Sequence, residues 1–415
     1  MMDRRRVVIT GLGCITALGE SAEQLFSDLC SGKSGVSNIE SFDTNAYPVH
    51  FAGEIKAFEI DRYVDRRDSK RMDRFAQFAV AAAAQAIKDS SLDISNEDPY
   101  RVGAIVGTGI GGIKEIEEQH LKLLEKGPRG VSPFCVPRLM ANAASGNIAI
   151  QYGLRGPNFC VSSACASGNH SIGEAFCSIA YGRSDVQITG GSEAAVTRIG
   201  LGSFCAARSL STRNDAPQAA SRPFDKDRDG FVLAEGAGIL VLEDYEHAKN
   251  RGARIYAELL GYGATNDGYH ITAPLPDGAG AAKAMEFALA DAGITRDKVD
   301  YINAHGTGTE LNDVAETTAI KTVFGPHAYK LSISSTKSCL GHMLGATAAV
   351  ELIVCVLTIN KGIIPPTINL ENPDPACDPK LDFVPLKAKP RKVNIAISNS
   401  LGFGGHNSCV AVGKI

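Results

Sequence analysis

Short apolar runs alternate with Ala-rich helical stretches along the chain. Four of the apolar runs have the length of a β-strand, at residues 6–11, 102–106, 159–163 and 186–189. Two stretches have a helical pattern, at residues 75–88 and 168–181. Strands that alternate with helices are typical of βαβ units, in which the strands run parallel. The pattern therefore predicts an α/β fold.

The second half of the chain repeats this order. An Ala-rich helix at residues 82–89 is followed by a polar loop, a strand and a Gly-rich turn that ends at Gly109. Residues 284–291 begin the same series, which ends at Gly308. In each half a further strand, a turn of small residues and a helix come next. Two α/β units can resemble each other by chance, but a structural repeat predicts two halves related by a pseudo-two-fold axis.

The boundary between the halves is expected near Lys249–Ala253, after a polar helix-like stretch, which divides the chain into residues 1–252 and 253–415. Corresponding strand ends of the two halves then converge on one crevice, where open α/β sheets bind their ligands. The turns of small residues around Cys165 and His342 are expected to meet there.

Residues 343–359 are apolar on nearly all sides of a helix. Glu351 lies in the middle, where a charge in a bilayer would cost roughly 2.5–3.5 kcal/mol. Gly345 and the alanines that follow suit close packing against other elements. The segment therefore predicts a fully buried central helix rather than a membrane span.

The composition is that of a soluble globular protein, with 44% hydrophobic and 21% charged residues among 415. A net charge of −4 leaves no basic excess for nucleic acid. The eleven cysteines are scattered and contain no CxxC pair, which predicts a reducing cytoplasm rather than a disulfide framework. The basic start, Met1 to Arg6, is followed by a short run interrupted by glycine, which favours a strand and turn over a signal peptide.

Cys165 is a candidate nucleophile. It lies in Val161-Ser162-Ser163-Ala164-Cys165-Ala166-Ser167-Gly168, between a strand-like run and a helical pattern. The positive end of a helix dipole favours a thiolate, and small neighbours leave room for a carbonyl and for N–H donors. Because a lone cysteine is usually an inert small hydrophobe, the case depends on further residues.

Two histidines complete the candidate site. His305 follows an apolar strand in Ala304-His305-Gly306-Thr307-Gly308-Thr309, and His342 is placed at the start of the buried helix. A helix N-terminus favours the neutral form of His342, and neutral imidazoles can donate a hydrogen bond to an enolate or oxyanion. Each histidine alone has an equally good structural explanation, but together with Cys165 they indicate catalysis.

Lys337 and a C-terminal loop also carry candidate chemistry. Lys337 lacks the Gly-rich loop of a phosphate-binding lysine, so a partly buried lysine that fixes nearby charges, with Glu351 as a partner, is favoured. Gly402-Phe403-Gly404-Gly405 indicates a mobile backbone around Phe403 that can supply N–H donors to an oxyanion. The alternative for this loop is a hairpin turn packed by one Phe.

Three other motifs are rejected. Asp225 to Gly230 resembles the start of a calcium loop, but the required glutamate falls one residue early, at Glu235. The glycines at 107–112 lack the spacing of a dinucleotide site, and Cys160 with Cys165 lacks a second ligand pair for zinc. No cofactor or metal is expected.

A basic cluster is the last feature that the function has to explain. Its members are Arg66, Arg67, Lys70, Arg71 and Arg74, with Arg129 and Arg208 as possible extensions. Such a run is either a solvated helix face or a docking patch for an acidic partner.

Taken together, the runs around Cys165, His305 to Thr309, Lys337 with Gly341-His342, and Gly402 to Gly405 resemble those of the β-ketoacyl-ACP synthases. The similarity spans essentially the whole chain. Thiolases share the fold but have a second catalytic cysteine in a C-terminal CxG, which is absent here. Other condensing enzymes of the fold have an asparagine where His342 stands.

The resemblance implies a thiolase-like five-layer αβαβα fold and a cytoplasmic homodimer that condenses acyl and malonyl thioesters carried by acyl carrier protein (ACP). It implies an acylated Cys165, an enolate held by His305 and His342, support from Lys337, and an oxyanion hole from the N–H groups of Cys165 and Phe403. Implied contacts to phosphopantetheine are Thr307 and Thr309. The implied lining of the acyl pocket is Ile110, Cys135, Ala164, Gly200, Phe204 and Leu344. The implied carrier-protein patch is Arg67, Lys70, Arg71, Arg129 and Arg208.

Some positions depart from the enterobacterial pattern. Cys135 stands where a Phe often lines the pocket, Glu310 where a Pro often follows the second Thr, and Leu401 where an aromatic precedes the Gly-rich loop. Ile110 is more similar to the synthase II branch than to synthase I. An iterative polyketide or aryl-polyene ketosynthase remains an alternative, as does a non-catalytic partner like a chain-length factor, although such subunits usually lose the cysteine.

Overall fold

The computed structural model describes residues 4–415, so Met1 to Asp3 of the basic start lie outside the described residues. A ten-stranded mixed sheet has the order β10-β9-β13-β14-β8-β1-β7-β6-β4-β5. The strands of the first half are β1 (Val7–Ile15), β4 (Val102–Gly107), β5 (Asn158–Phe159), β6 (Val186–Glu193) and β7 (Gly236–Asp244). Those of the second half are β8 (Ala257–Asn266), β9 (Tyr301–Asn303), β10 (Ser332–Ser334), β13 (Ile395–Gly402) and β14 (His406–Gly413).

Parallel and antiparallel strand pairs follow one another in the same order from each edge of the sheet to its centre. The two outer pairs, β10 with β9 and β9 with β13, are parallel, as are β5 with β4 and β4 with β6. The inner pairs are antiparallel on both sides, and β1 pairs with β8 at the centre. Two related halves are therefore confirmed, whereas their exact boundary at residue 252 stays a prediction.

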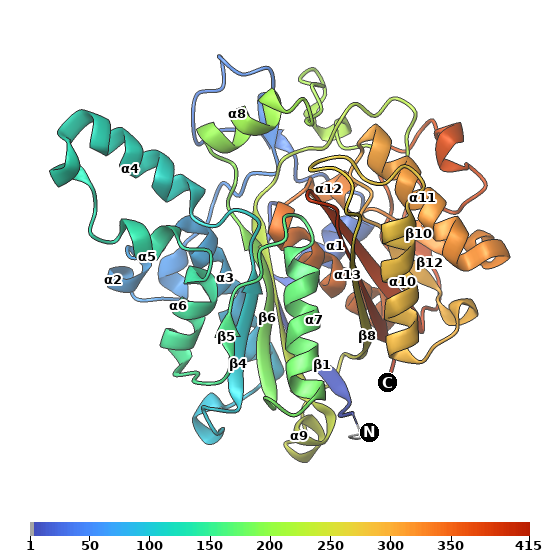
Figure 1. Cartoon of the computed structure of the whole chain (residues 1–415), viewed down its shortest axis with the longest axis horizontal. Coiled ribbons are helices and arrows are strands. Elements are labelled where there is room, and N and C mark those ends of the chain that lie inside the picture. The colour runs from blue at the N-terminus through green and yellow to red at the C-terminus, as the bar shows by residue number, and fades with distance from the viewer. Residues whose placement is uncertain (1–3) are drawn as a thin grey trace.

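Helices form three layers around the strands (Figure 1). On the first half lie α3 (Arg74–Ser90) and α6 (Ala143–Tyr152), and on the second half lie α10 (Ala279–Ala292) and α11 (Glu310–Phe324). Between the halves lie α7 (Ser167–Ala180) and α13 (Thr347–Lys361), which contact strands of both. The five layers confirm the thiolase-like αβαβα fold.

The remaining elements form the rim and the connections. The helices are α1 (Ala22–Cys30), α2 (Arg66–Ser69), α4 (Ile113–Lys126), α5 (Cys135–Leu139), α8 (Arg198–Ala206), α9 (Tyr245–Asn250) and α12 (Lys337–Leu340). Two small sheets pair β2 (Ser37–Asn38) with β3 (Phe51–Ala52) and β11 (Ile363–Ile364) with β12 (Lys389–Pro390).

Helix α13 is the predicted central helix. Every residue from Thr347 to Ile359 is buried. By length and composition the segment Leu344–Lys361 could cross a membrane, but 89% of it is buried inside the protein. Its apolar surface packs against strands of both halves, which explains why hydrophobic residues cover all its faces.

Three predicted strands have different lengths in the structure, and one of them, β6, continues past Thr189 to Glu193. The strand expected at residues 159–163 is wrong beyond Phe159, because the chain leaves the sheet edge and turns at Ser163 to Cys165. In contrast, β1 continues past Gly11 to Ile15. A Cβ on Gly11 would lie 2.1 Å from the carbonyl oxygen of Ala86 on α3, so this glycine permits close packing of helix on strand rather than a turn.

Candidate active site

One cavity of about 710 Å³ brings together residues from both halves of the fold. Cys165 and Ala164 reach it from the turn before α7, His305 from the loop after β9, and His342 from the loop between α12 and α13. The other predicted site residues that line it are Ile110, Phe204, Arg208, Thr307, Thr309, Leu344 and Phe403. The expected convergence of the cysteine and both histidines is confirmed.

The turn around Cys165 is held tightly. Ala164 has a φ of +50°, which an L-residue rarely adopts, and the Cys165 carbonyl accepts a hydrogen bond from the Ser400 hydroxyl (2.8 Å). A Cβ on Gly402 would lie 2.9 Å from the Ser163 carbonyl oxygen and 3.1 Å from the Cys165 nitrogen. A glycine before Phe403 therefore lets the C-terminal loop approach the nucleophile turn.

The Cys165 thiol is protonated at rest. Burial raises its pKa to about 12, and the Glu193 carboxylate adds to the rise. The Lys337 charge and the N–H groups of Phe403 and Cys165 oppose it without cancelling it. The helix dipole is expected to favour a thiolate, and burial acts on the pKa in the opposite direction. The same two N–H groups are placed to stabilise negative charge beside the sulfur.

Both histidines are neutral. Burial, followed by the Lys337 charge, holds the pKa of His305 and that of His342 well below the usual range. Their ring centroids lie 5.3 Å apart at 83°. His342 Nδ1 lies 3.0 Å from the Thr347 hydroxyl oxygen, and its buried Nε2 has no hydrogen-bond partner among residues 4–415.

His342 lies just before the central helical segment, as expected. A short 3-10 turn, Leu344–Ala346, leads directly into α13, so the histidine is two residues from the start of helical backbone. Its backbone N–H donates to the Val232 carbonyl (2.7 Å). Burial, followed by the Lys337 charge, is what holds the pKa of the ring well below its usual range.

Lys337 is paired as expected. Its ammonium lies 2.6 Å from a carboxylate oxygen of Glu351, and each side chain is 1% exposed. Burial raises the pKa of Glu351 to about 7, and the Lys337 charge opposes this rise. The pair places a positive charge behind the two imidazoles without exposing it to the cavity.

Two buried glutamates position cavity residues and were missed by the sequence reasoning. Glu193 accepts hydrogen bonds from Gly109 N (2.7 Å), Ile110 N (3.2 Å) and Gly345 N (3.1 Å). Glu316 accepts from His305 N and from Gly306 N, both at 2.8 Å. Each lies in a regular element, where an isolated acidic residue is the only signal in the sequence.

Some residues implied by the resemblance lie elsewhere. Neither Cys135 on α5 nor Gly200 on α8 lines the cavity of the single chain. The carboxylate of Asp225, which begins the rejected calcium loop, accepts a hydrogen bond from the Arg222 guanidinium (3.0 Å). Four members of the basic patch are exposed away from the cavity: Arg67, Lys70, Arg71 and Arg129. Arg208 is exposed and lines the cavity.

Both halves of the chain match models of known protein families. Residues 4–248 match the model of the beta-ketoacyl synthase N-terminal domain, and residues 256–371 match that of the C-terminal domain. The chain belongs to the beta-ketoacyl synthase family. Two similar relatives in this family are both called 3-oxoacyl-[acyl-carrier-protein] synthase 2. The protein from Synechocystis is 50% identical over 100% of this chain and 99% of its own length. The protein from Vibrio cholerae is 50% identical over 98% of each chain.

Solved beta-ketoacyl synthase structures have the same fold. The ishigamide ketosynthase/chain length factor has a TM-score of 0.93 at 39% identity and covers 99% of this chain and 100% of its own. A type II polyketide ketosynthase bound to its acyl-carrier protein, AntDE:AntF, has a TM-score of 0.92 at 37% identity, with 99% and 100% covered. The family resemblance seen in the sequence is thereby confirmed.

Proposed function

We propose that the protein catalyses the decarboxylative Claisen condensation of malonyl-ACP with an acyl chain on Cys165, giving 3-oxoacyl-ACP. This reaction elongates chains in type II fatty-acid synthesis. The observation that carries the proposal is the shared cavity, in which a thiol flanked by two N–H donors meets two neutral imidazoles.

In the first half-reaction the acyl group moves to the enzyme. Cys165 Sγ forms a bond to the thioester carbonyl of acyl-ACP, and the bond from that carbon to the carrier sulfur breaks. The Cys165 proton ends on the departing carrier thiol, so charge balances. Negative charge that develops on the carbonyl oxygen is stabilised by the N–H groups of Cys165 and Phe403.

In the second half-reaction malonyl-ACP loses carbon dioxide. The electron pair of the broken C–C bond forms an enolate, whose oxygen accepts hydrogen bonds from His305 and His342. A neutral imidazole suits this role because it donates a hydrogen bond and keeps its proton. Lys337 supports it by holding the pKa of both rings low. The carbanion then attacks the Cys165 thioester, the bond from the acyl carbon to Sγ breaks, and the departing thiolate takes one proton from solvent water. Decarboxylation supplies the nucleophile, so the proposed reaction uses no cofactor.

The substrates are carried by ACP in this proposal. Thr307 and Thr309 line the cavity, and their hydroxyl oxygens lie 3.0 Å apart, in a suitable place for the phosphopantetheine arm. Arg67, Lys70, Arg71 and Arg129, together with Arg208 at the cavity, offer exposed positive charge to an acidic carrier. The double variant Lys70→Glu with Arg71→Glu should raise the KM for acyl-ACP about tenfold or more, and should leave the KM for an acyl thioester of free pantetheine unchanged. An equal rise of the KM for both substrates would exclude a role of the patch in binding the carrier protein.

A homodimer and a cytoplasmic location complete the proposal. Apolar side chains are exposed on α4 and α5, and β5 is the last strand at its edge of the sheet in the described part of the chain. Cys135 lies on α5 outside the cavity of the single chain, and in the proposed homodimer it contributes to the acyl pocket of the second copy. The eleven cysteines are all free thiols, which suits a reducing compartment.

Fatty-acid elongation is favoured over an iterative polyketide ketosynthase by sequence identity. The relatives called 3-oxoacyl-[acyl-carrier-protein] synthase 2 are about 50% identical, whereas the type II polyketide ketosynthase is 37% identical. A non-catalytic chain-length factor is disfavoured by an intact site.

Purified protein supplied with acyl-ACP and malonyl-ACP tests the function. We expect release of carbon dioxide and a 3-oxoacyl-ACP two carbons longer, identified by intact-protein mass spectrometry. Cys165→Ser should abolish the product, while His305→Ala should block decarboxylation and leave Cys165 acylation measurable. Products extended several times without reduction would indicate the polyketide alternative, and no product from the wild type would indicate a non-catalytic partner.

A further inference from the structure

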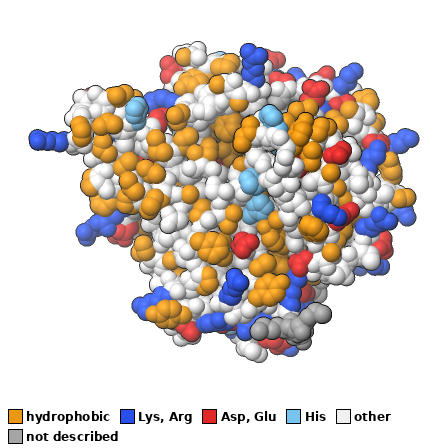
Figure 2. Space-filling model, in the orientation of Figure 1, with side chains coloured by type: hydrophobic (Ala, Val, Ile, Leu, Met, Phe, Trp, Pro, Cys, Tyr) orange, Lys and Arg blue, Asp and Glu red, His pale blue; other side chains and the backbone are white. Residues whose placement is uncertain are grey.

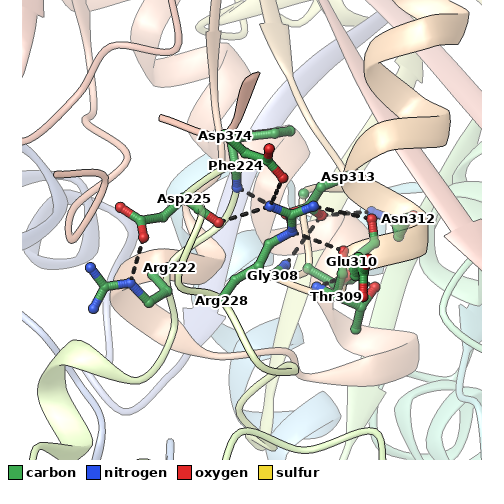
Figure 3. Close-up of polar contacts among 12 residues, drawn as sticks. Arg222, Phe224, Asp225, Arg228, Gly308, Thr309, Glu310, Asn312, Asp313 and Asp374 are labelled. Carbon is green, nitrogen blue, oxygen red and sulfur yellow. Dashed lines mark hydrogen bonds and ion pairs between the residues drawn. The ribbon is translucent and has the colours of Figure 1, made fainter. Parts of the chain in front are cut away.

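Arg228 is a buried cation whose partners come from three separate segments (Figure 3). Its side chain is 2% exposed and lines the cavity beside the threonine loop, residues 307–310. Nη1 donates to a carboxylate oxygen of Asp374 (2.6 Å) and to the Asp225 carbonyl (2.8 Å). Nε donates to the Thr309 carbonyl (3.4 Å), and Nη2 to the Glu310 carbonyl (3.2 Å). The guanidinium therefore fixes two consecutive carbonyls of the threonine loop.

Asp313 holds the same loop from the other side. Its carboxylate lies 3.5 Å from Arg228 Nε and accepts hydrogen bonds from Gly308 N (3.2 Å) and Phe224 N (2.9 Å). Burial raises the pKa of Asp313, and Arg228 opposes this rise, so the cation favours the charged acceptor. An amide and two carbonyls of the threonine loop are thus all fixed by one buried ion pair.

We propose that Arg228 is a positioning residue that sets the threonine loop, and with it the Thr307 and Thr309 hydroxyls, for the thioester arm of the carrier protein. This role rests on the proposed function. Arg228 donates its hydrogen bonds to other residues of the protein, so it acts on the substrate through the threonine loop.

A lysine cannot reproduce this arrangement. The guanidinium is planar and presents donors in several fixed directions, which serve Asp374, Asp225, Thr309 and Glu310 at once. The ammonium of a lysine keeps the charge but donates all its hydrogen bonds from one nitrogen. Arg228→Lys therefore retains the ion pair with Asp374 and releases loop carbonyls, which separates positioning from charge.

Arg222 provides a matched control on the same turn. It is also buried, at 8% side-chain exposure, and its guanidinium donates to the Asp225 carboxylate (3.0 Å). Its hydrogen bonds go to Asp225 and to the Ala219 carbonyl rather than to the threonine loop. Arg222→Lys thus disturbs the same turn without releasing the loop.

The test is steady-state condensation with malonyl-ACP by wild type, Arg228→Lys and Arg222→Lys. We expect the KM of Arg228→Lys for malonyl-ACP to rise about tenfold, the effect of one lost charge-assisted hydrogen bond, with kcat changed by less than about threefold. Arg222→Lys should keep the KM of the wild type. Alkylation of Cys165 by iodoacetamide should proceed at the same rate in all three proteins, since the nucleophile turn is untouched.

A second variant keeps the test informative if Arg228→Lys does not fold. Asp374→Asn leaves Arg228 in place but weakens its strongest partner, and should raise KM about threefold. Equal KM values for Arg228→Lys and Arg222→Lys would overturn the positioning role. So would a loss of kcat, thermal stability and Cys165 alkylation together, which marks a general structural role. If the wild type itself forms no 3-oxoacyl product, the proposed function fails and this role fails with it.

Discussion

The Cys165 thiol lies between two opposing electrostatic influences. It directly precedes α7, whose dipole favours a thiolate, and it is buried, which favours the thiol. A helix dipole contributes about 0.3–1 kcal/mol at an accessible site, less than one pKa unit, whereas full burial shifts a pKa by up to about 3–5 units. Burial therefore has the larger effect on the pKa. In the proposed reaction the thiol loses its proton only as the sulfur attacks the thioester.

The pH dependence of Cys165 alkylation tests this balance. With a pKa of about 12, the thiolate fraction rises tenfold with each pH unit, so the rate with iodoacetamide should rise about tenfold per unit between pH 6 and 9 without a plateau. Mass spectrometry of the peptide that contains Cys165 separates this thiol from the other ten. A free thiol in the same tube levels off near its pKa of about 8.5 and serves as the control. A plateau for Cys165 below pH 8 would mean that the sulfur is ionised at neutral pH.

At the residue scale the sequence predicted the candidate side chains and the neutral form of the histidines, but not the raised pKa of the Cys165 thiol. Cys165, His305 and His342 stand out because each lies among small residues after an apolar run. Their protonation depends on burial and on Lys337, which only the folded chain brings together. Glu193 and Glu316 escaped notice for the same reason, since their partners are backbone N–H groups of distant loops.

At the scale of elements, one buried ion pair joins α12 to α13. Lys337 lies in α12 and Glu351 near the middle of α13, and the charges neutralise each other in an apolar layer. Removing one member of a buried pair costs about 3–5 kcal/mol, because the other charge stays unpaired, whereas replacing both by apolar residues is often neutral.

The Lys337–Glu351 pair allows stability and catalysis to be separated. Lys337→Met should lower the free energy of unfolding by about 3 kcal/mol, and Lys337→Met with Glu351→Leu should restore most of it. Catalysis should stay impaired in the double variant. Because the Lys337 charge lowers the pKa of both histidines, its loss raises them, and the acid limb of kcat should move to higher pH.

Thermal unfolding and pH–rate profiles of the three proteins measure these effects. An unchanged melting temperature for Lys337→Met would show that the pair is not needed for stability. A double variant with normal kcat at every pH would exclude an electrostatic role for Lys337.

A helix or strand could be predicted from the sequence where its contacts with the interior leave a regular pattern of apolar positions. Helices α3, α7 and α13 were expected because their apolar positions follow a helical period or cover all faces. The strand at 159–163 was overestimated, since the turn that ends it is set by packing around Cys165 and not by residue type. The strand predicted at residues 6–11 ends too early, because the sequence does not show that α3 packs against β1 at Gly11.

At the scale of the whole molecule, the internal repeat predicted the symmetric sheet, but no pattern in one chain shows which surface a second copy covers. The structure has an exposed apolar surface that suits the proposed homodimer. Leu124 on α4 is 71% exposed, Val136 on α5 is 61% exposed, and Phe159 on the edge strand β5 is 43% exposed. Figure 2 shows hydrophobic side chains gathered over the lobe that α4 and α5 form. An unpaired edge strand next to exposed apolar side chains suits an isologous interface, in which the same surface of both copies meets.

The proposed homodimer predicts a change of mass on substitution at this edge. The wild type should have twice the 43.7 kDa of the chain by light scattering, and Phe159→Asp should shift it toward the monomer, because a buried unpaired carboxylate at the interface is costly. Phe287→Asp is the matched control, since Phe287 on α10 is 47% exposed but lies on the other half of the fold. A wild type that is monomeric at micromolar concentration, or a Phe159→Asp protein that stays dimeric, would exclude β5 as the interface.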